Sequence, residues 1–503
     1  MKFISLFSLL FFPVIHSSAQ NKQQINIEHA DLFSYKEVNG VKLKMLVGNV
    51  WLSQKDLSLF CDSANFYNDE NRVEAFGNVH IQQSDSVDVY GEILKYNGNT
   101  RKAVLKKNVV MTDHQMKLTT DTLYYDIATK TGKYLTGGTL LDGQTKLFSK
   151  RGYYYSTSDD AFFKDSVVLI DPQYTLTCDT LQFNSKTHRA IFHGNTVIVS
   201  EESTILCSEG WYDTEQDIAS FGKNTSVVND SQTLNADSLY YNRNTAFGQA
   251  MKNVVWNDAA QNLKIESEYA EFYERNDFII ATDHALLTDY SSNDSFFLTA
   301  DTLKSNFDSL AGYRNFFAYH QVKMFRSNLQ GVCDSLFFSY KDSVFRMFDN
   351  PVLWNDENQL LADTIRILMK NKTVDGIQLI SNAFICNRTD EGLFNQIKGR
   401  NIYGYFKDEE LNKMYVEGNG ESVYYGQNDA KAYVGVNKST CSNMWVRFAN
   451  QKVDRITFLE LPEATFTPMQ KINPADFMLE NFIWLQDERP ESKNDLVEGM
   501  EDL

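Results

Sequence analysis

The chain has 503 residues, a formal net charge of −18 at pH 7, 43% hydrophobic and 13% aromatic residues. This composition excludes a disordered chain, because so much apolar surface can form a core. The excess of negative charge argues against a nucleic-acid-binding protein, which needs a basic surface. Only 7 prolines occur in the whole chain, which suits long and regular strand pairing.

Residues 1–19 have the pattern of a secretory signal peptide. Lys2 precedes an apolar stretch at 4–15, and Ser-Ser-Ala at 17–19 provides a small-residue cleavage site. No cysteine lies near this site, and no later stretch reaches the ~18 apolar residues of a membrane helix. We therefore expect a soluble protein that is exported to the periplasm, and the sequence leaves association with the outer membrane open.

A pattern of about nine residues recurs roughly every 30 residues. It runs through an apolar residue, a small residue, an acidic residue, Ser or Thr, Leu and an aromatic residue. Clear copies are LTTDTLYYD at 118–126, LTCDTLQFN at 176–184 and LNADSLYYN at 234–242. In successive copies the acidic position holds Asp62, Glu92, Asp121, Arg151, Asp179, Ser208, Asp237, Glu268, Asp301, Asp334, Asp363 and Arg400. Repeats of this length indicate one small structural unit that is copied and stacked.

Each repeat has a second half that predicts another strand. It carries Gly or Asn followed by Val and alternating apolar residues, as in AFGNVHI at 75–81 and HGNTVIV at 193–199. Both halves are rich in β-branched and aromatic residues, and turn residues such as the Asn-Gly-Asn at 97–99 separate them. Turns this short make neighbouring strands antiparallel. We therefore predict an all-β fold of about twelve two-strand repeats, with a parallel β-helix as the alternative fold.

The apolar positions in the first half of a repeat break the alternation of a regular strand. Apolar or small residues lie three and one before the acidic position, but two and four after it. Strict alternation would put these two sets on opposite faces. A β-bulge or a bend at the acidic position would turn both sets inward. A strand that is buried on both faces is the alternative.

The cysteines follow the repeat. Those that stand immediately before the acidic position are Cys61, Cys178, Cys207 and Cys333. Cys441 fits the same position in a degenerate last copy, and Cys386 lies outside the pattern. Other copies have Ala, Gly, Ser or Thr there, and free cysteine packs as a small apolar residue. Buried thiols are therefore predicted, and a disulfide framework is the alternative for an exported chain.

The organisation along the chain changes twice. Residues 20–300 hold regular repeats, whereas 301–460 hold longer and more divergent ones that either continue the same sheet or form a second subdomain. Residues 461–503 contain four of the seven prolines and have an acidic end. Within them, Asn473–Leu485 begins with Asn and Pro at the positions of a helix N-terminus. This predicts a short helix that covers an open end of the sheet.

The sequence carries no catalytic motif that we recognise. It has no G-x-S-x-G, phosphate-binding loop or dinucleotide fingerprint, and the spacing of His188 and His193 fits no zinc motif. One acidic residue per repeat cannot supply the 6–8 oxygens that calcium takes. We expect that residue to stabilise a turn or bulge by accepting backbone N–H bonds. The prediction is a non-enzymatic protein without metal or other cofactor, and a carbohydrate-active enzyme stays an alternative.

Charge is unevenly distributed. Between Val89 and Lys164 basic residues outnumber acidic ones, although the whole chain is acidic. A locally positive surface suits an anionic headgroup, with Lys102, Lys106 and Lys107 as the candidate residues. A solvated face of turns is the alternative explanation.

The recurring L-x-A-D-x-L-x-Y followed by A-x-G-N-V, after a signal peptide, resembles the OstA-like family. This family comprises the periplasmic lipopolysaccharide-transport bridge and its relatives. The similarity covers most of residues 25–430, and the chain looks most like the long OstA-like proteins of Bacteroidota. It is longer than the simple bridge and lacks the C-terminal barrel of the outer-membrane translocon.

The resemblance implies an elongated, twisted antiparallel β-jellyroll that holds the acyl chains of lipopolysaccharide in its apolar interior. It also implies partners from the same transport system, docked end to end by strand addition. The residues that would line the interior lie two and four positions after the acidic one: Leu94, Tyr96, Leu123, Tyr125, Leu181, Phe183, Leu239 and Tyr241. A structural subunit of envelope assembly, with a filled core, is the alternative function.

Overall fold

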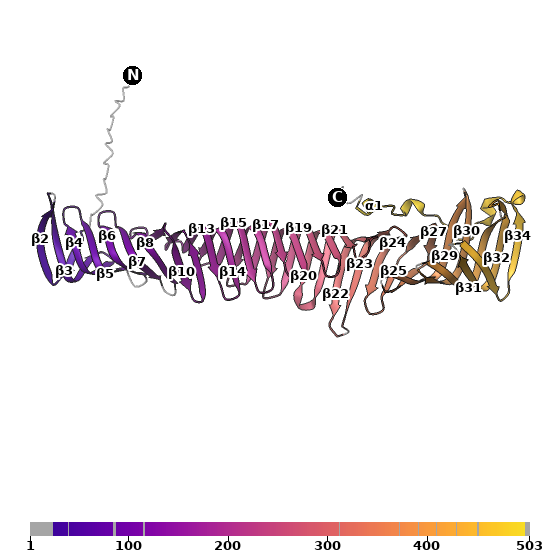
Figure 1. Ribbon diagram of the computed structural model, residues 1–503, viewed down its shortest axis with the longest axis horizontal. Coiled ribbons are helices and arrows are strands. Elements are labelled where there is room, and N and C mark those ends of the chain that lie inside the picture. The colour runs from indigo at the N-terminus through magenta and orange to yellow at the C-terminus, as the bar shows by residue number, and fades with distance from the viewer. Residues whose placement is uncertain are drawn as a thin grey trace, which may run out of the picture. The chain divides into compact units, whose positions relative to one another are not determined.

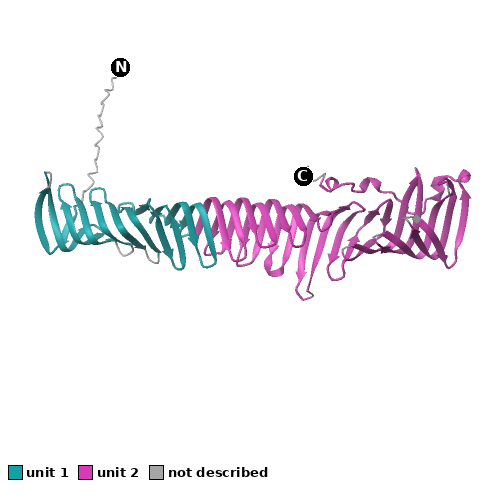
Figure 2. Cartoon of the chain, viewed as in Figure 1, with its two compact units in different colours: residues 1–188 teal, residues 189–503 magenta. Residues whose placement is uncertain are grey.

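The computed structural model describes residues 24–38, 40–83, 87–113, 116–310, 312–371, 373–390, 392–408, 410–428, 430–449 and 452–497. The predicted signal peptide lies outside these residues. The chain divides into two compact units, residues 1–188 and 189–503 (Figure 2). This division falls inside the stretch 20–300, and the predicted change of repeat character after residue 300 stays a prediction.

Unit 1 is built from antiparallel strands that follow one another in chain order (Figure 1). They are β1 (Asn26–His29), β2 (Leu32–Val38), β3 (Val41–Gln54), β4 (Leu57–Tyr67), β5 (Arg72–Gln83), β6 (Val87–Asn97), β7 (Lys102–Asp113), β8 (Met116–Asp126), β9 (Thr131–Tyr134), β10 (Gly138–Asp142), β11 (Thr145–Ser149), β12 (Arg151–Tyr155), β13 (Asp160–Ile170) and β14 (Tyr174–Asn184).

Unit 2 continues with strands of the same kind and ends in a tail of short helices. Its strands are β15 (Arg189–Ser200), β16 (Thr204–Asp213), β17 (Ile218–Val228), β18 (Gln232–Asn242), β19 (Phe247–Asp258), β20 (Leu263–Tyr273), β21 (Phe278–Asp289), β22 (Phe296–Asp308), β23 (Tyr313–Arg326), β24 (Leu329–Ser339), β25 (Val344–Phe348), β26 (Val352–Asn355), β27 (Asn358–Leu361), β28 (Thr364–Lys370), β29 (Thr373–Asp390), β30 (Leu393–Lys407), β31 (Glu410–Gln427), β32 (Tyr433–Ala449), β33 (Lys452–Leu459) and β34 (Glu463–Pro468). The helical turns are η1 (Glu274–Asn276), η2 (Met469–Lys471), η3 (Pro474–Phe477), η4 (Gln486–Glu488) and α1 (Asn494–Val497).

The predicted all-β fold of two-strand antiparallel repeats is confirmed, and its antiparallel pairing excludes the parallel β-helix. More strands form than the two dozen expected, because some expected strands are broken in two. In unit 1, β8 pairs with both β9 and β10, and β13 pairs with both β11 and β12. In unit 2, β24 pairs with both β25 and β26.

The predicted bend at the acidic position is confirmed, and the extra residue lies on the neighbouring strand. Between β4 and β5 the register shifts so that two residues, Cys61 and Asp62, face three, Gly77 to Val79. Gly77 and Asn78 both have positive φ, 72° and 43°. Such a bulge bends the strand pair, so apolar residues on both sides of it turn inward. Val89 before the bend of β6 and Leu94 after it are both fully buried.

The carboxylate at the bend mostly binds an Asn side chain, and the predicted bond from a backbone N–H is found at Glu268, which accepts from Asn253 N at 3.4 Å. Asn78 donates its Nδ2 to both oxygens of Asp62, at 3.2 and 3.0 Å. Equivalent Asn-to-carboxylate bonds join Asn108 to Glu92, Asn253 to Asp237 and Asn382 to Asp363. Gly77 also has to be small, because a Cβ there would collide with the Asp62 carboxylate. The bend is therefore stabilised by a polar pair that recurs from repeat to repeat.

The helix predicted at Asn473–Leu485 is wrong. This segment contains one 3-10 turn, η3, and the α-helix of the tail is α1, further along the chain. Asn473 makes no side-chain capping bond, and the backbone of Phe477 to Leu485 bonds to glutamines of the sheet instead. The tail also packs on the outer face of the sheet rather than over its end. No helix among the described residues is long and apolar enough to cross a bilayer.

All six cysteines are buried and none forms a disulfide, which confirms the prediction of thiols over disulfides. Burial raises the pKa of Cys61 and Cys333 to about 12 and that of Cys207 to about 11. Neutral, buried thiols of this kind behave as small apolar side chains. Ala236 and Ala300 occupy the equivalent position elsewhere and are equally buried.

We expect Cys178→Ala to be mild, since alanine serves the same position in other repeats. Cys178→Leu should lower the free energy of unfolding by roughly 1–3 kcal/mol, because two additional non-hydrogen atoms would overpack the site. Ala236→Cys is the matched control and should be tolerated. Chemical denaturation of the three variants tests this; a harmless Cys178→Leu would contradict it.

One bend of unit 1 carries an ion pair in place of the carboxylate–Asn pair. Arg151 and Thr180 both pair with Lys164, so the residue at the predicted acidic position of this repeat is Lys150 and not Arg151. The Arg151 guanidinium bonds to Asp165, the first of two bulge residues with positive φ. Arg151→Asp should destabilise the protein by placing two carboxylates together. Adding Asp165→Asn should restore stability, because the amide removes the repulsion and can donate a hydrogen bond to the new carboxylate.

Acidity should weaken the native Arg151–Asp165 pair. The hydrogen bond and charge of Arg151 hold the pKa of Asp165 below its ordinary 3.8. The pair therefore contributes fully above that pH, and its contribution is lost as pH falls through the lowered pKa. Unfolding measured at pH 7 and below pH 3 should show this loss. For the substitutions above, a protein with both Arg151→Asp and Asp165→Asn that is as unstable as Arg151→Asp alone would show that the pair does not contribute to stability.

Candidate functional site

A row of inward-facing residues crosses unit 1 from strand to strand. Cross-strand pairing places Tyr125, Gly132, Tyr154, Ala161 and Phe183 side by side on β8, β9, β12, β13 and β14. Aromatic and small residues alternate along this row. Tyr125 and Phe183 lie four positions after Asp121 and Asp179, Tyr154 lies four positions after Lys150, and the small residues come from the intervening strands. The alternation leaves a notch between each two rings.

A second inward row runs beside the first. It consists of Tyr134, Gly152, Phe163 and Leu181, again paired across neighbouring strands. Gly152 is required here, because any Cβ would collide with the ring of Tyr134. The Tyr134 hydroxyl bonds to Ser149 Oγ at 2.6 Å, and burial raises the pKa of Tyr134 to about 12. The Tyr134 side chain is therefore uncharged and held in one position.

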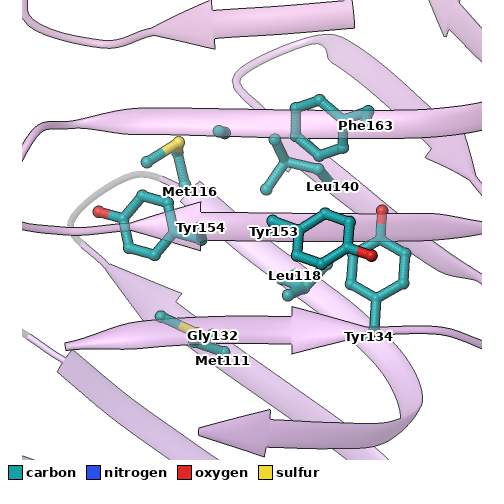
Figure 3. Close-up of a pocket in the computed structure, with 11 residues that line it drawn as sticks. Met111, Met116, Leu118, Gly132, Tyr134, Leu140, Tyr153, Tyr154 and Phe163 are labelled. Atoms are coloured by element: carbon teal, nitrogen blue, oxygen red, sulfur yellow. The ribbon is translucent and has the colours of Figure 1, made fainter. Parts of the chain in front are cut away.

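An apolar pocket of about 50 Å³ lies between these rows. In Figure 3 Tyr134, Leu140 and Phe163 gather on one side of it and Met116 and Tyr154 on the other. The lining residues are Met111, Met116, Leu118, Gly132, Tyr134, Leu140, Gly152, Tyr153, Tyr154, Ala161 and Phe163. None of them carries a charge, so the pocket offers an apolar ligand nothing but hydrocarbon, ring and thioether surface, with tyrosine hydroxyls.

The size of the pocket restricts what it can hold without rearrangement. It is well below the ~150 Å³ of a cavity that binds benzene, so it accommodates a few methylene groups. Met116 and Leu118 are half-buried at its border. Methionine has three rotatable bonds and repacks readily, so these side chains can give way to a longer chain.

Four of the predicted lining residues lie in a filled core. Leu94, Tyr96, Leu123 and Tyr125 point inward as predicted, and each is at most 2% exposed. The hydroxyl of Tyr96 donates to Gln54 Oε1, and that of Tyr125 donates to Gln83 Oε1 at 2.7 Å. Burial raises the pKa of Tyr96 to about 12. Leu123 and Tyr125 also adjoin Gly132 at the pocket.

The later predicted residues of unit 1 are less covered. Leu181 is buried, but Phe183 is half-buried, as is Tyr154 in the same row. The inner row therefore passes from fully packed at Tyr125 to accessible at Tyr154 and Phe183. The pocket lies at this transition.

Unit 2 contains a comparable row of its own. Pairing places Tyr212, Ala219, Tyr241, Gly248 and Phe272 side by side on β16 to β20. The predicted residue Leu239 is buried, whereas Tyr241 is half-buried and its hydroxyl donates to Glu274 at 2.8 Å. Burial and this carboxylate raise the pKa of Tyr241 to about 12. The rings of this row are also accessible in part.

The predicted headgroup residues lie on the outer surface. Lys102, Lys106 and Lys107 are exposed on β7. Lys102 Nζ is 3.7 Å from Asp126, and Lys107 Nζ is 4.0 Å from Glu92. The structure does not bring these ammonium groups into the pocket.

Among the described residues no group of three His, Cys, Asp or Glu side chains is arranged to hold a metal ion.

The sequence contained a signal for the pocket that we did not use. Gly132, Gly137, Gly138, Gly143 and Gly152 cluster in the one repeat of this region that has a basic residue in place of the acidic one. These glycines accompany the broken strands β9 to β12 and remove side chains from the inner rows. A local excess of glycine in an otherwise regular β-repeat therefore marks the place where packing is interrupted.

Comparisons with known proteins support the family suggested by the repeat. A search of curated proteins gave no match. A similar solved structure is that of LptH from Pseudomonas aeruginosa, described as the LptA homologous periplasmic component of the conserved lipopolysaccharide transport device. It is 11% identical, with a TM-score of 0.20, and the match covers 21% of this chain and 81% of LptH. This similarity is too low to support a functional conclusion.

A family model described as OstA-like protein matches residues 22–179. The matched stretch includes the regular bends of unit 1, the filled core and the apolar pocket. Over residues 22–179 the chain is therefore similar to the OstA-like family.

Proposed function

We propose that this protein is a non-enzymatic carrier that binds the acyl chains of lipopolysaccharide, or of a related lipid, on its inner face in the periplasm. The observation that carries the proposal is the uncharged pocket at Tyr134, Tyr154 and Phe163, which lies where the inner face becomes accessible. The OstA-like match over the same residues supports it. Transport to the outer membrane, and docking to partners of the transport system by strand addition, are parts of the proposal.

Aromatic rings separated by small residues suit an acyl chain. Neighbouring strands are ~4.8 Å apart, so successive rings of a row are ~10 Å apart with a notch between them. A hydrocarbon chain lying in the notches would bury apolar surface on both sides and gain about 0.8 kcal/mol for each buried CH₂ group. Exposed Lys102, Lys106 and Lys107 would then act from outside, on anionic groups of the same lipid.

The filled core of unit 1 favours a second candidate, a structural subunit of envelope assembly. Tyr96 and Tyr125 are enclosed and have their hydroxyls satisfied by glutamines, as in an ordinary protein interior. The two candidates differ in whether lipid reaches Tyr154 and Phe183.

Photo-crosslinking at single positions separates the two candidates. A photoreactive residue at Tyr154 or Phe183 should capture lipopolysaccharide in living cells, because both positions lie on the accessible part of the inner row. The same residue at Tyr124 or Gln182, the neighbours that point outward, should not. Capture at Tyr125 should be weaker than at Phe183, since Tyr125 is enclosed. Equal capture on both faces, or none in a folded protein, would favour the structural subunit.

Filling the pocket should reduce lipid capture without unfolding the protein. A Cβ added at Gly132 would make ordinary contacts of 3.8 Å with Leu123 and Tyr125, so Gly132→Val fits there. Valine suits a strand, and its methyl groups would occupy the pocket. We expect lower lipopolysaccharide capture from Phe183 in Gly132→Val. Gly248→Val, at the equivalent place in the row of unit 2, is the control and should leave capture at Phe183 unchanged.

A further inference from the structure

The tail after β34 runs back along unit 2 on the outer face of its sheet (Figure 1). It starts beside β32, and α1 contacts β22 and β23. Apolar side chains beneath it form a cluster that is separate from the inner core, and they include Phe384, Leu393, Val423, Tyr425 and Val436. From the tail, Leu479, Phe482 and Trp484 pack against this outer cluster. The tail therefore covers an apolar surface that the sheet itself leaves open.

Buried glutamines hold the tail by its backbone. Gln396 donates to Phe477 O at 3.0 Å and accepts from Leu479 N at 2.8 Å. Gln359 donates to Ile483 O at 2.8 Å and accepts from Leu485 N at 2.7 Å. In each case one side-chain amide pairs with both polar groups of an extended segment, as a neighbouring strand would.

A third glutamine binds the tail through a side chain. Gln330 Oε1 accepts from Arg489 Nε at 2.9 Å and from Nη2 at 2.7 Å. Gln330, Gln359 and Gln396 are each at most 2% exposed. All three lie four residues before the acidic position of their repeats, in LQGVCD, NQLLAD and NQIKGR. We call these three residues the glutamine ladder.

The distance between successive contacts of the tail, its step, matches the spacing of the repeats in the sheet. Successive glutamines of the ladder are two strands apart, about 10 Å. Between its first two contacts the tail advances six residues and contains a turn, with Asn481 at φ 67° and Phe482 N bonded to Leu479 O. A fully extended segment of six residues would span ~20 Å, so the turn shortens the step to fit the ladder.

Two buried polar atoms beneath the tail lack partners. Trp354 lies across from both Gln330 and Gln359, and its Nε1 has no hydrogen-bond partner among the described residues. The hydroxyl of Tyr425, in the outer cluster, has none either. Water would satisfy both groups if the tail left, so the docked state carries a penalty that release removes.

We propose that the glutamine ladder and the outer cluster form a binding site for an extended peptide, and that the chain's own tail is a detachable occupant of it. The ladder recognises the backbone at two of its three contacts, and the outer cluster recognises apolar side chains at the spacing of Leu479, Phe482 and Trp484. The ligand class is therefore an extended apolar peptide of about 25 residues with a turn at each step. Within unit 2 this site is separate from the inner core, because its apolar cluster lies on the other face of the sheet.

Cys386 reports on this site in the unmodified chain. It is 0% exposed beneath the tail, and its Sγ lies 4.0 Å from Ile483 O. Cys333 belongs to the inner core of the same unit. Thiol labelling followed by peptide mapping of the full chain should modify Cys386 at least about tenfold faster than Cys333, because the tail opens without the sheet. Equal rates would mean that the tail opens only when the unit unfolds, and would overturn detachment.

Substitutions in the ladder sharpen the measurement. Gln396 pairs directly with Cys386 across the strands, so Gln330 is the ladder residue to change. Gln330→Ala, on β24 and away from Cys386 on β29, should raise the labelling rate of Cys386 about tenfold by weakening the tail. Gln54→Ala is the matched control, since Gln54 is a buried, hydrogen-bonded glutamine of unit 1. It should leave Cys386 unchanged. A ladder variant without effect on Cys386 would overturn the role of the ladder.

Binding in trans tests the site itself. The full chain with Leu479→Ser and Phe482→Ser should release its tail, so that Cys386 labels rapidly while Cys333 stays protected and reports an intact sheet. A synthetic peptide of residues 469–497 should then restore the protection of Cys386, and a peptide carrying the same two substitutions should not. Failure of the first peptide to protect Cys386, with Cys333 protected, would overturn the peptide-binding site.

Discussion

The bend at the acidic position is the constraint on which the inner face of this protein depends. A regular strand would alternate its side chains along its whole length, so the apolar residues after the acidic position would point to solvent. The neighbouring strand has one extra residue at the bend, held at positive φ. This bulge changes the parity of the strand, that is, which alternate residues point inward before and after the bend. The carboxylate–Asn pair then fixes the bulge at the same height in repeat after repeat. The pair itself is exposed and contributes little on its own, but the parity it sets decides which side of the sheet is apolar.

Once the parity is set, the inner rows follow from the two halves of the repeat. The first half supplies an aromatic residue four positions after the bend, and the second half supplies a small one opposite to it. Where the small residue is Ala103, the gap between rings is filled by their own packing and the core is closed. Where it is Gly132, the strands are also broken and a pocket remains. The same repeat can thus give a filled core or an accessible row, and the choice depends on one or two residues per strand.

Sequence reasoning reached the features that repeat and missed those that occur once. The bend, the inward direction of Leu94 and Tyr96 and the buried thiols follow from patterns present in many copies, so each copy supports the others. The pocket depends on broken strands in a single stretch, which the averaged pattern conceals. The helix at Asn473–Leu485 failed for a different reason. Its Asn-Pro start is a valid local signal, but Gln359 and Gln396 bind the backbone of the segment in an extended form, and tertiary contacts override local preference.

The two faces of the sheet in unit 2 are stabilised by different means. The inner face packs on itself through residues such as Met347, Ile365 and Leu379, each at most 1% exposed. The outer face has to be covered, because its apolar cluster would otherwise lie in water. A peptide that bonds to glutamines placed once per repeat can only sit in one register, since a shift of one residue would turn its apolar side chains away from the sheet.

Because the glutamines and the acidic position belong to the same repeat, the bend that orients the inner face also sets the spacing of the outer one. A change in the number of residues between two bends would therefore disturb both faces at once, whereas a change in the tail would affect only the outer one.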